Sequence, residues 1–482
     1  MPFNSIDFAI FLPIVFFLYW FVFNKNIRNQ NVFIIAASYF FYGSWDWRFL
    51  GLIVFSTVVD YVLSLQMAKS KRKGYRKMYL LLSLLVNLGL LGFFKYYNFF
   101  LESFTEAFTV FGVHLELGLL NIILPIGISF YTFQTLSYSI DVYRDKVPAT
   151  KDFTAFAAFV CFFPQLVAGP IERASNLLPQ FKKQRIFDRA NSVDGLRQIL
   201  WGLFKKIVIA DSCGVFVDQF YNNYAELNGS TMFLAVIFFN FQLYGDFSGY
   251  SDIAIGVSRL FGFNLKQNFA FPYFSRDMSE FYRRWHISLS SWLKAYLYIP
   301  LGGSRVRLIK QLRNIFIVFL LSGLWHGANW TFVIWGLINA MYFLPLILLK
   351  KNRVFLDVVA KDRIYPSIKE LWLMGGTFVL AGIGYVFFRS IDITQAWGVI
   401  KKLFSASLFQ LPSFEEEKKA LIIFILVLFF IVVEWFGRHQ KYAIEKIGFS
   451  WSRWRRWMWY YFLVIMILIF WKSEQQFIYF QF

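Results

Sequence analysis

The sequence predicts an all-α polytopic membrane protein, and three observations carry this prediction. Apolar residues make up 58% of the 482 residues and charged residues only 16%, whereas soluble domains average about 45–50% and about 25%. Aromatic residues alone reach 22%. Apolar runs that could form the cores of ~20-residue spans recur from end to end. We therefore expect about 11–12 transmembrane helices.

The net charge of +20 could indicate nucleic-acid binding, but the basic residues are scattered between apolar runs. In a membrane protein such charge marks cytoplasmic loops and contact with anionic lipid headgroups. We expect a lipid bilayer as the surrounding medium and no nucleic acid as a partner.

The first spans are expected near residues 6–23, 31–43 and 48–67. They are followed by KSKRKGYRK at 69–77, which holds six basic residues and no acid. Basic loops stay on the cytoplasmic side, so the N-terminus is expected outside. A fourth span is expected near 78–100.

The middle of the chain is irregular. A span over 117–140 is interrupted by Pro125 and Gly127. The apolar segment 153–167 lies between two loops that we expect inside, which predicts a re-entrant or interfacial segment. Irregular backbone at membrane depth is tolerated only where protein or a water-filled cavity covers it. The segment 196–220 contains Lys205, Lys206 and Asp211, so it is expected to face protein or an interface.

The second half contains further spans and one long basic segment. Arginines are frequent between residues 259 and 313, which are expected to lean towards the cytoplasm. No linker, low-complexity tract or repeat is evident, so we expect a single membrane domain over 1–482, with catalytic motifs within 120–345. The remaining spans are expected near 232–255, 315–325, 330–349, 371–388, 420–436 and 457–471.

Two of the four histidines lie in unusual contexts. His326 stands in LSGLWHGANWTFVIWG, where Gly323, Gly327 and Asn329 suggest a break or a close approach at membrane depth. An ionisable side chain is costly in a bilayer and usually sits there for a reason. A neutral imidazole can accept a proton from a hydroxyl. A histidine bonded to a neighbouring carbonyl in a Trp-rich interfacial belt is the alternative, and the residues alone leave both open.

His286 stands in FYRRWHISLSSW, beside Arg283, Arg284 and Ser288. The other two histidines, His114 and His439, lie in expected loops and are interpreted as solvated or interfacial. The sequence has no HExxH, GxSxG or HxxxxD arrangement, and its two cysteines have no CxxC spacing. We therefore expect no metal site and no bound cofactor.

Long stretches up to about residue 345 form a recognisable set. The sequence resembles the membrane-bound O-acyltransferase (MBOAT) family, most closely the bacterial branch that serves alginate O-acetylation. The stretches are MPFNSIDFAIFLPIVFFLYW, ASYFFYGSWDWRFL, LPIGISFYTFQTLSYSIDVYR, FFPQLVAGPIER, YGDFSGYSDIAIG, FYRRWHISLSSWL and LSGLWHGANWTFVIWG.

This resemblance implies a ring of tilted helices with re-entrant segments around a central tunnel. It implies that His326, in the WHG motif, is the catalytic histidine and general base, and that His286, in the WHxSxxxWL motif, is the second catalytic residue. An acyl thioester, acetyl-coenzyme A above all, is the expected donor substrate. The residues expected to bind substrate are Trp325, Asn329, Trp285, Ser288, Arg283 and Arg284.

The resemblance also implies the surroundings of the reaction. The enzyme is expected in the bacterial cytoplasmic (inner) membrane. It is expected to pass an acyl group to an extracytoplasmic SGNH-hydrolase-like protein, which then acylates a cell-envelope or exported polysaccharide. D-alanyl transfer to teichoic acid by the same fold is the alternative enzyme, and a donor assay separates the two. A transporter is the alternative class, and substrate flux without an acceptor would identify it.

Overall fold

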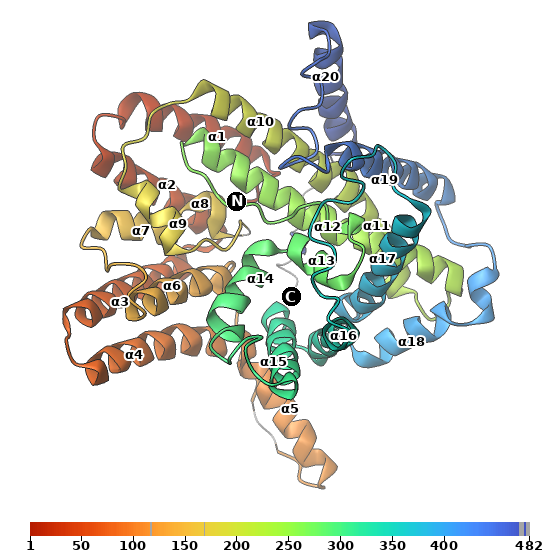
Figure 1. The fold of residues 1–482 in the computed structure, drawn as a ribbon, viewed down its shortest axis with the longest axis horizontal. Coiled ribbons are helices and arrows are strands. Elements are labelled where there is room, and N and C mark those ends of the chain that lie inside the picture. Colours follow the sequence, from red (N-terminus) through yellow and green to blue (C-terminus); the bar gives the residue numbers. More distant parts are fainter. Residues whose placement is uncertain (116–117, 168, 472–476, 479–482) are drawn as a thin grey trace. The chain divides into compact units, whose positions relative to one another are not determined.

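The computed structural model of the chain describes residues 1–115, 118–167, 169–471 and 477–478 (Figure 1). Helices are the regular structure of these described residues, and no strand occurs among them. The prediction of an all-α fold is therefore confirmed. Packing divides the chain into two compact units, 1–192 with 257–265, and 193–256 with 266–482. The single membrane domain expected from the sequence stays a prediction.

The first unit consists of helices that follow the expected spans, with two corrections. The span expected near 78–100 is part of a longer helical segment from Lys73 to Val110. The helix expected to run through 117–140 begins only at Ile128, because Gly127 adopts a left-handed conformation with φ of 76°; Leu117 lies outside the described residues. The helices are α1 Ile6–Phe17, α2 Ile27–Asp46, α3 Leu50–Lys69, α4 Lys73–Leu91, α5 Tyr97–Val110, α6 Ile128–Tyr143, α7 Phe153–Cys161, α8 Phe163–Leu166 and α9 Ala174–Phe181.

The second unit begins within α10 and contains every predicted site residue. Its helix α18 was not among the expected spans. It has eleven residues and two lysines in its last turn, so its sequence does not indicate a transmembrane helix. The helices are α10 Arg189–Leu203, α11 Asp211–Asn222, α12 Gly229–Leu260, α13 Met278–Arg284, α14 Ile287–Leu293, α15 Leu308–His326, α16 Trp330–Leu348, α17 Ile368–Arg389, α18 Ile393–Leu403, α19 Glu417–Gly437 and α20 Arg453–Phe470.

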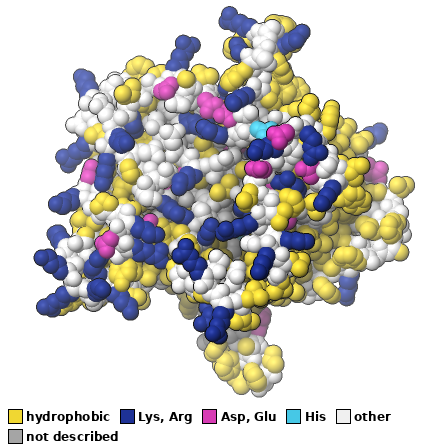
Figure 2. Space-filling view, viewed as in Figure 1, with side chains coloured by type: hydrophobic (Ala, Val, Ile, Leu, Met, Phe, Trp, Pro, Cys, Tyr) yellow, Lys and Arg dark blue, Asp and Glu magenta, His cyan; other side chains and the backbone are white. Residues whose placement is uncertain are grey.

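Six helical segments of the described chain are long and apolar enough to cross a membrane. Large apolar side chains such as Leu85 and Phe21 are exposed on the surface, where lipid, unlike water, accommodates them. Figure 2 shows Lys and Arg side chains spread over the face in view, with apolar side chains exposed among them. The protein is a multi-pass membrane protein, and the span count of about 11–12 stays a prediction. The six segments are 27–69, 73–110, 308–326, 330–348, 368–389 and 417–437.

A buried carboxylate joins three helices of the first unit. Asp60 of α3 is completely buried and accepts hydrogen bonds from Ser83 Oγ at 2.5 Å and from Asn87 Nδ2 at 2.9 Å, both on α4. Ser139 Oγ of α6 donates to the same carboxylate at 3.3 Å. Figure 1 shows these three helices side by side. Because buried polar groups need partners, this cluster fixes the mutual register of α3, α4 and α6.

Replacing Asp60 with leucine is expected to destabilise the protein by at least about 2 kcal/mol, because each buried donor left without an acceptor costs about 1–3 kcal/mol. The donors affected are those of Ser83, Asn87 and Ser139. Asp60→Asn keeps one oxygen acceptor and should lose less. Thermal unfolding of the detergent-purified variants measures this difference. Equal unfolding temperatures for Asp60→Leu and the wild type would show that the cluster contributes nothing to stability.

Candidate active site

The stretch around His326 is a break between two helices, as the sequence predicted. Helix α15 ends at His326, Gly327 has extended backbone, and α16 begins after Asn329. The Asn329 side chain accepts from the Thr331 backbone N–H at 2.9 Å, which caps α16. Its Nδ2 donates to the Ile391 carbonyl at 2.9 Å. Asn329 therefore has a structural role in this break, and its predicted role in substrate binding stays a prediction.

A glycine brings the two helices together behind the break. A Cβ atom at Gly323 would overlap the carbonyl oxygen of Phe332, which lies on α16. Only glycine therefore allows α15 and α16 to approach this closely. The close approach fixes the end of α15, and with it the position of His326.

His326 is buried in an aromatic environment, with 5% of its surface exposed. The ring centroids of Trp325, Trp335 and Phe388 lie 4.9, 5.1 and 5.3 Å from that of the imidazole. The Trp335 ring meets the imidazole edge-on, at an interplanar angle of 86°. Such walls leave little room for bulk water around a reacting group.

His286 occupies a strained position between α13 and α14. It is the residue before α14 and has left-handed backbone, with φ of 44°. A non-glycine residue in this region costs about 1–3 kcal/mol and persists only where its surroundings enforce it. Its side chain is 2% exposed and meets the Phe247 ring edge-on at 4.6 Å between centroids.

The strain at His286 is enforced by Asn268, a residue in no predicted motif. The Asn268 carbonyl accepts from the Ile287 backbone N–H at 2.9 Å. Its side-chain Oδ1 lies 3.1 Å from His286 Nδ1. The same Oδ1 accepts from the backbone N–H of Ser288 at 3.2 Å and from the Ser288 hydroxyl at 2.8 Å. Ser288, a predicted substrate-binding residue, thus donates two hydrogen bonds to Asn268.

The structure brings the two predicted catalytic histidines together. The rings of His286 and His326 lie 6.5 Å apart between centroids, although the residues come from different elements. Trp325, another predicted site residue, lies 6.0 Å from His286 and 4.9 Å from His326. The resemblance implied catalytic roles for both histidines, and the structure shows that they converge in one buried aromatic cluster.

The other predicted site residues make contacts within α13 and with the segment 352–357. Trp285 stacks on Phe281 at 5.4 Å between centroids. Arg283 donates to the Phe355 carbonyl at 2.6 Å and to the Asn352 carbonyl at 3.1 Å. Arg284 forms an ion pair with Glu280 at 2.9 Å. These arginines tie α13 to itself and to the segment 352–357, and their predicted contact with substrate stays a prediction. His114 and His439 are exposed.

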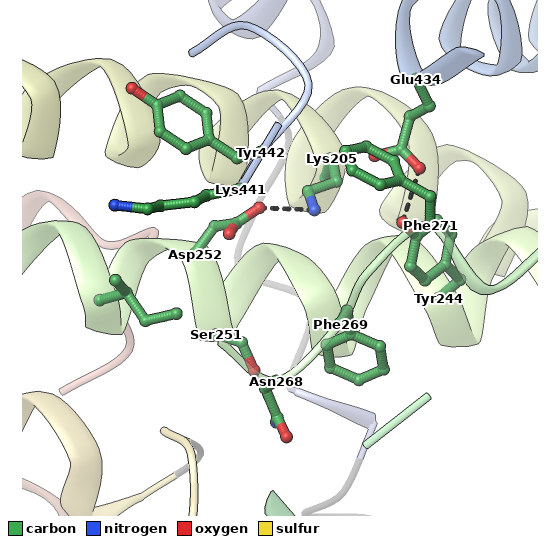
Figure 3. A pocket seen from close by; sticks show the side chains of 11 residues that line it. Lys205, Tyr244, Ser251, Asp252, Asn268, Phe269, Phe271, Glu434, Lys441 and Tyr442 are labelled. Carbon is green, nitrogen blue, oxygen red and sulfur yellow. Dashed lines mark hydrogen bonds and ion pairs between the residues drawn. The ribbon is translucent and has the colours of Figure 1, made fainter. Parts of the chain in front are cut away.

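A polar pocket adjoins Asn268 (Figure 3). Lys205 pairs with Asp252 at 2.6 Å, and the Tyr244 hydroxyl donates to Glu434 at 2.6 Å. Asp246, which lies on α12 like Asp252, pairs with Lys206 at 2.7 Å. The sequence did not predict Lys205 or Asn268 as site residues, because neither belongs to a motif whose spacing indicates a chemical function.

The pKa of His286 predicts how stability depends on pH. Burial lowers this pKa from its ordinary value of 6.5 to about 3. Between these values the unfolded chain binds a proton that the folded protein does not, so stability falls as the pH falls through this range. At pH 5 this group should cost about 2 kcal/mol relative to neutral pH.

The measurement is the unfolding temperature at pH 7 and pH 5 for the wild type and His286→Gln. We expect the variant to lose less stability on acidification, since glutamine binds no proton. An identical acid sensitivity of the two proteins would contradict the assigned shift of the His286 pKa.

Comparison with known proteins places this chain in a family. Residues 134–355 match the model of the family described as MBOAT, membrane-bound O-acyltransferase. The chain is 40% identical to a Pseudomonas aeruginosa protein named probable alginate O-acetylase AlgI. The alignment spans 449 residues, which are 92% of this chain and 82% of that protein. It is 38% identical to a Helicobacter pylori peptidoglycan O-acetyltransferase, over 81% of this chain and 77% of that protein.

A more distant similarity concerns the alternative enzyme. The chain is 30% identical to a Streptococcus thermophilus teichoic acid D-alanyltransferase, over 50% of this chain and 62% of that protein. The alginate and peptidoglycan relatives are both more similar and matched over far more of the chain. With its apolar spans and its paired motif histidines, this chain belongs to the membrane-bound O-acyltransferase family and is an O-acyltransferase.

Proposed function

We propose that the enzyme transfers an acetyl group from acetyl-coenzyme A, a cytoplasmic thioester, for O-acetylation of a cell-envelope or exported polysaccharide. The observation that supports this most is the meeting of His286 and His326 at 6.5 Å between ring centroids inside one buried aromatic cluster. Two relatives are named probable alginate O-acetylase and peptidoglycan O-acetyltransferase, and these names support acetyl transfer to a polysaccharide.

In the proposed reaction His326 acts as the general base. Its imidazole accepts the proton of the acceptor hydroxyl while the hydroxyl oxygen attacks the thioester carbonyl carbon. The carbon–sulfur bond then breaks, and the proton passes from His326 to the departing thiolate. The products are the ester and the free thiol, so no further reactant is required. The aromatic walls around His326 would limit hydrolysis of the donor.

The immediate acceptor in this proposal is the serine of an extracytoplasmic SGNH-hydrolase-like protein. That protein would then acylate the polysaccharide outside a bacterial cytoplasmic membrane. The basic segment between residues 276 and 313 suits the phosphates of coenzyme A on the cytoplasmic side. Substrate contacts are proposed for Trp325, Asn329, Trp285, Ser288, Arg283 and Arg284, which flank the two histidines in sequence.

The test uses the full chain in proteoliposomes with the partner protein that its genetic neighbourhood supplies. One arm receives labelled acetyl-coenzyme A, and the other receives a D-alanyl thioester on its carrier protein. We expect labelled ester on the partner only with acetyl-coenzyme A. Transfer from the aminoacyl carrier alone would support the teichoic acid alternative, and flux of donor without ester formation would support a transporter.

A further inference from the structure

We propose that Asn268 is a positioning residue of the active site, which holds His286 in the tautomer with hydrogen on Nδ1 and presents Nε2 to the substrate as a hydrogen-bond acceptor. This inference rests on the proposed function for its effect on catalysis. Its structural part, the tautomer itself, does not depend on any activity.

The hydrogen bonds of Asn268 fix the orientation of its amide. A backbone N–H can only donate, and that of Ser288 points at the side-chain atom 3.2 Å away. The atom must therefore be the acceptor Oδ1 and not the donor Nδ2. The other end of the amide then donates to Ser251 Oγ at 3.1 Å. Both ends of the Asn268 amide are satisfied in this orientation and in no other.

The orientation of Asn268 dictates the tautomer of His286. An oxygen that accepts from Ser288 has no hydrogen to offer to His286 Nδ1 at 3.1 Å. The hydrogen between these atoms must belong to Nδ1, because two lone pairs would otherwise face each other. Ser288 Oγ lies 3.5 Å from the same nitrogen, too far to replace this bond. A neutral imidazole with hydrogen on Nδ1 carries a lone pair on Nε2.

The lone pair on Nε2 is the unusual feature of this arrangement. The atom is fully buried, and it has no hydrogen-bond partner among the residues that the structure describes. A buried acceptor without a donor costs about 1–3 kcal/mol, in addition to the backbone strain at His286. A bound substrate that donates an O–H or N–H to Nε2 removes this cost, so the arrangement is prepared for a ligand.

Asn268 is itself held by a rigid charged cluster. Its partner Ser251 lies on α12, next to Asp252. The Asp252 carboxylate forms an ion pair with Lys205 at 2.6 Å and accepts a hydrogen bond from Gln198 Nε2 at 2.7 Å. Figure 3 shows Ser251 and Asn268 beside one another at the edge of this pocket. The cluster keeps Asn268 from turning, and Asn268 keeps His286 from turning.

Changing the charge of Asn268 would act on His286 directly. Asn268→Asp retains an oxygen acceptor but adds a negative charge, which favours the protonated imidazole and raises the pKa of His286. The elements packed around these two residues carry further ionisable groups. They are Tyr244, Asp246 and Asp252 of α12, Lys205 before α11, Glu280, Arg283 and Arg284 of α13, His326 of α15, Glu434 of α19, and Lys441 and Tyr442 after α19.

The first experiment measures the tautomer without activity. The chain has four histidines, so replacing His114, His326 and His439 with glutamine leaves His286 as the one labelled imidazole in ¹³C,¹⁵N-histidine solid-state NMR. We expect the shifts of the Nδ1–H tautomer, and we expect them to change in Asn268→Leu. An Nε2–H tautomer with Asn268 present would overturn the proposal, whatever the donor of the enzyme proves to be.

The second experiment measures transfer with whichever thioester the wild type accepts. We expect Asn268→Leu to lower kcat about 10–100-fold with little change in KM for the donor, the loss typical where a residue that orients a metal-bound imidazole is removed. Asn268→Asp should recover most of kcat and shift the acidic limb of the pH profile to higher pH. The control is Asn240→Leu, which replaces a buried asparagine whose side chain donates to the Val236 carbonyl of its own helix.

The two asparagine variants decide between positioning and packing. Equal losses of kcat in Asn268→Leu and Asn240→Leu would reduce Asn268 to a packing role and overturn the proposal. An inactive Asn268→Asp with an unchanged unfolding temperature would overturn it as well. A wild type that accepts no thioester at all would instead refute the proposed function and leave the NMR result standing.

Discussion

Replacing His326 with alanine is expected to abolish acyl transfer while the protein still folds. General base catalysis contributes about 10²–10⁴-fold to a rate, and without His326 no other group is proposed to take the hydroxyl proton. His326→Gln fills nearly the same space with a group that cannot act as a base at neutral pH, so it should be as inactive. Labelled ester on the partner protein measures the transfer, and thermal unfolding in detergent measures the fold.

Two histidines provide matched controls. His114 and His439 are exposed, so alanine at either position should leave both transfer and unfolding temperature near the wild-type values. Turnover of His326→Ala at the rate of these controls would end its assignment as the base. If His326→Ala lost both activity and the fold, His326→Gln would distinguish a catalytic loss from a folding loss. Glutamine leaves no cavity in the aromatic cluster around Trp335 and Phe388.

The helices were largely predictable because their boundaries depend on local chemistry. The break after His326 could be predicted from Gly327 and Asn329, since glycine ends a helix readily and asparagine caps the next one. The start of α6 was misplaced for the opposite reason. Pro125 and Gly127 marked an interruption of the apolar run 117–140, but only the backbone shows that Gly127 is left-handed and that the helix begins at Ile128.

The candidate site was predictable only where a motif marked it. His286 and His326 stand in recognisable stretches, and no spacing rule could have stated that their rings lie 6.5 Å apart. Asn268 precedes His286 by 18 residues and carries no signal of its own, because an asparagine in a loop reads as a turn residue. Its role depends on the contact between Asn268 and His286, which tertiary packing determines and the local sequence pattern does not.

The buried charges of the second unit were visible in the sequence, but their partners were not. Lys206 lies between α10 and α11, where a lysine in an apolar run suggested an interface. Its Nζ faces protein, as expected, and lies 2.7 Å from Asp246 and 2.8 Å from Asp211, with 1% of the side chain exposed. Asp246 also accepts from the Ile478 backbone N–H at 2.6 Å. One lysine therefore compensates two carboxylates from different helices.

Replacing Lys206 with methionine should destabilise the protein by about 3–5 kcal/mol, the cost of leaving buried charges without their partner. The control is Lys419→Met, which removes an exposed ion pair with Glu416 and should cost at most about 1 kcal/mol. Adding Asp246→Leu to Lys206→Met should recover part of the loss, because one uncompensated charge disappears. Unfolding temperatures of the single and double variants measure this coupling. If Lys206→Met unfolded at the same temperature as Lys419→Met, the buried lysine would be dispensable, and the register between α11 and α12 would have to come from apolar packing alone.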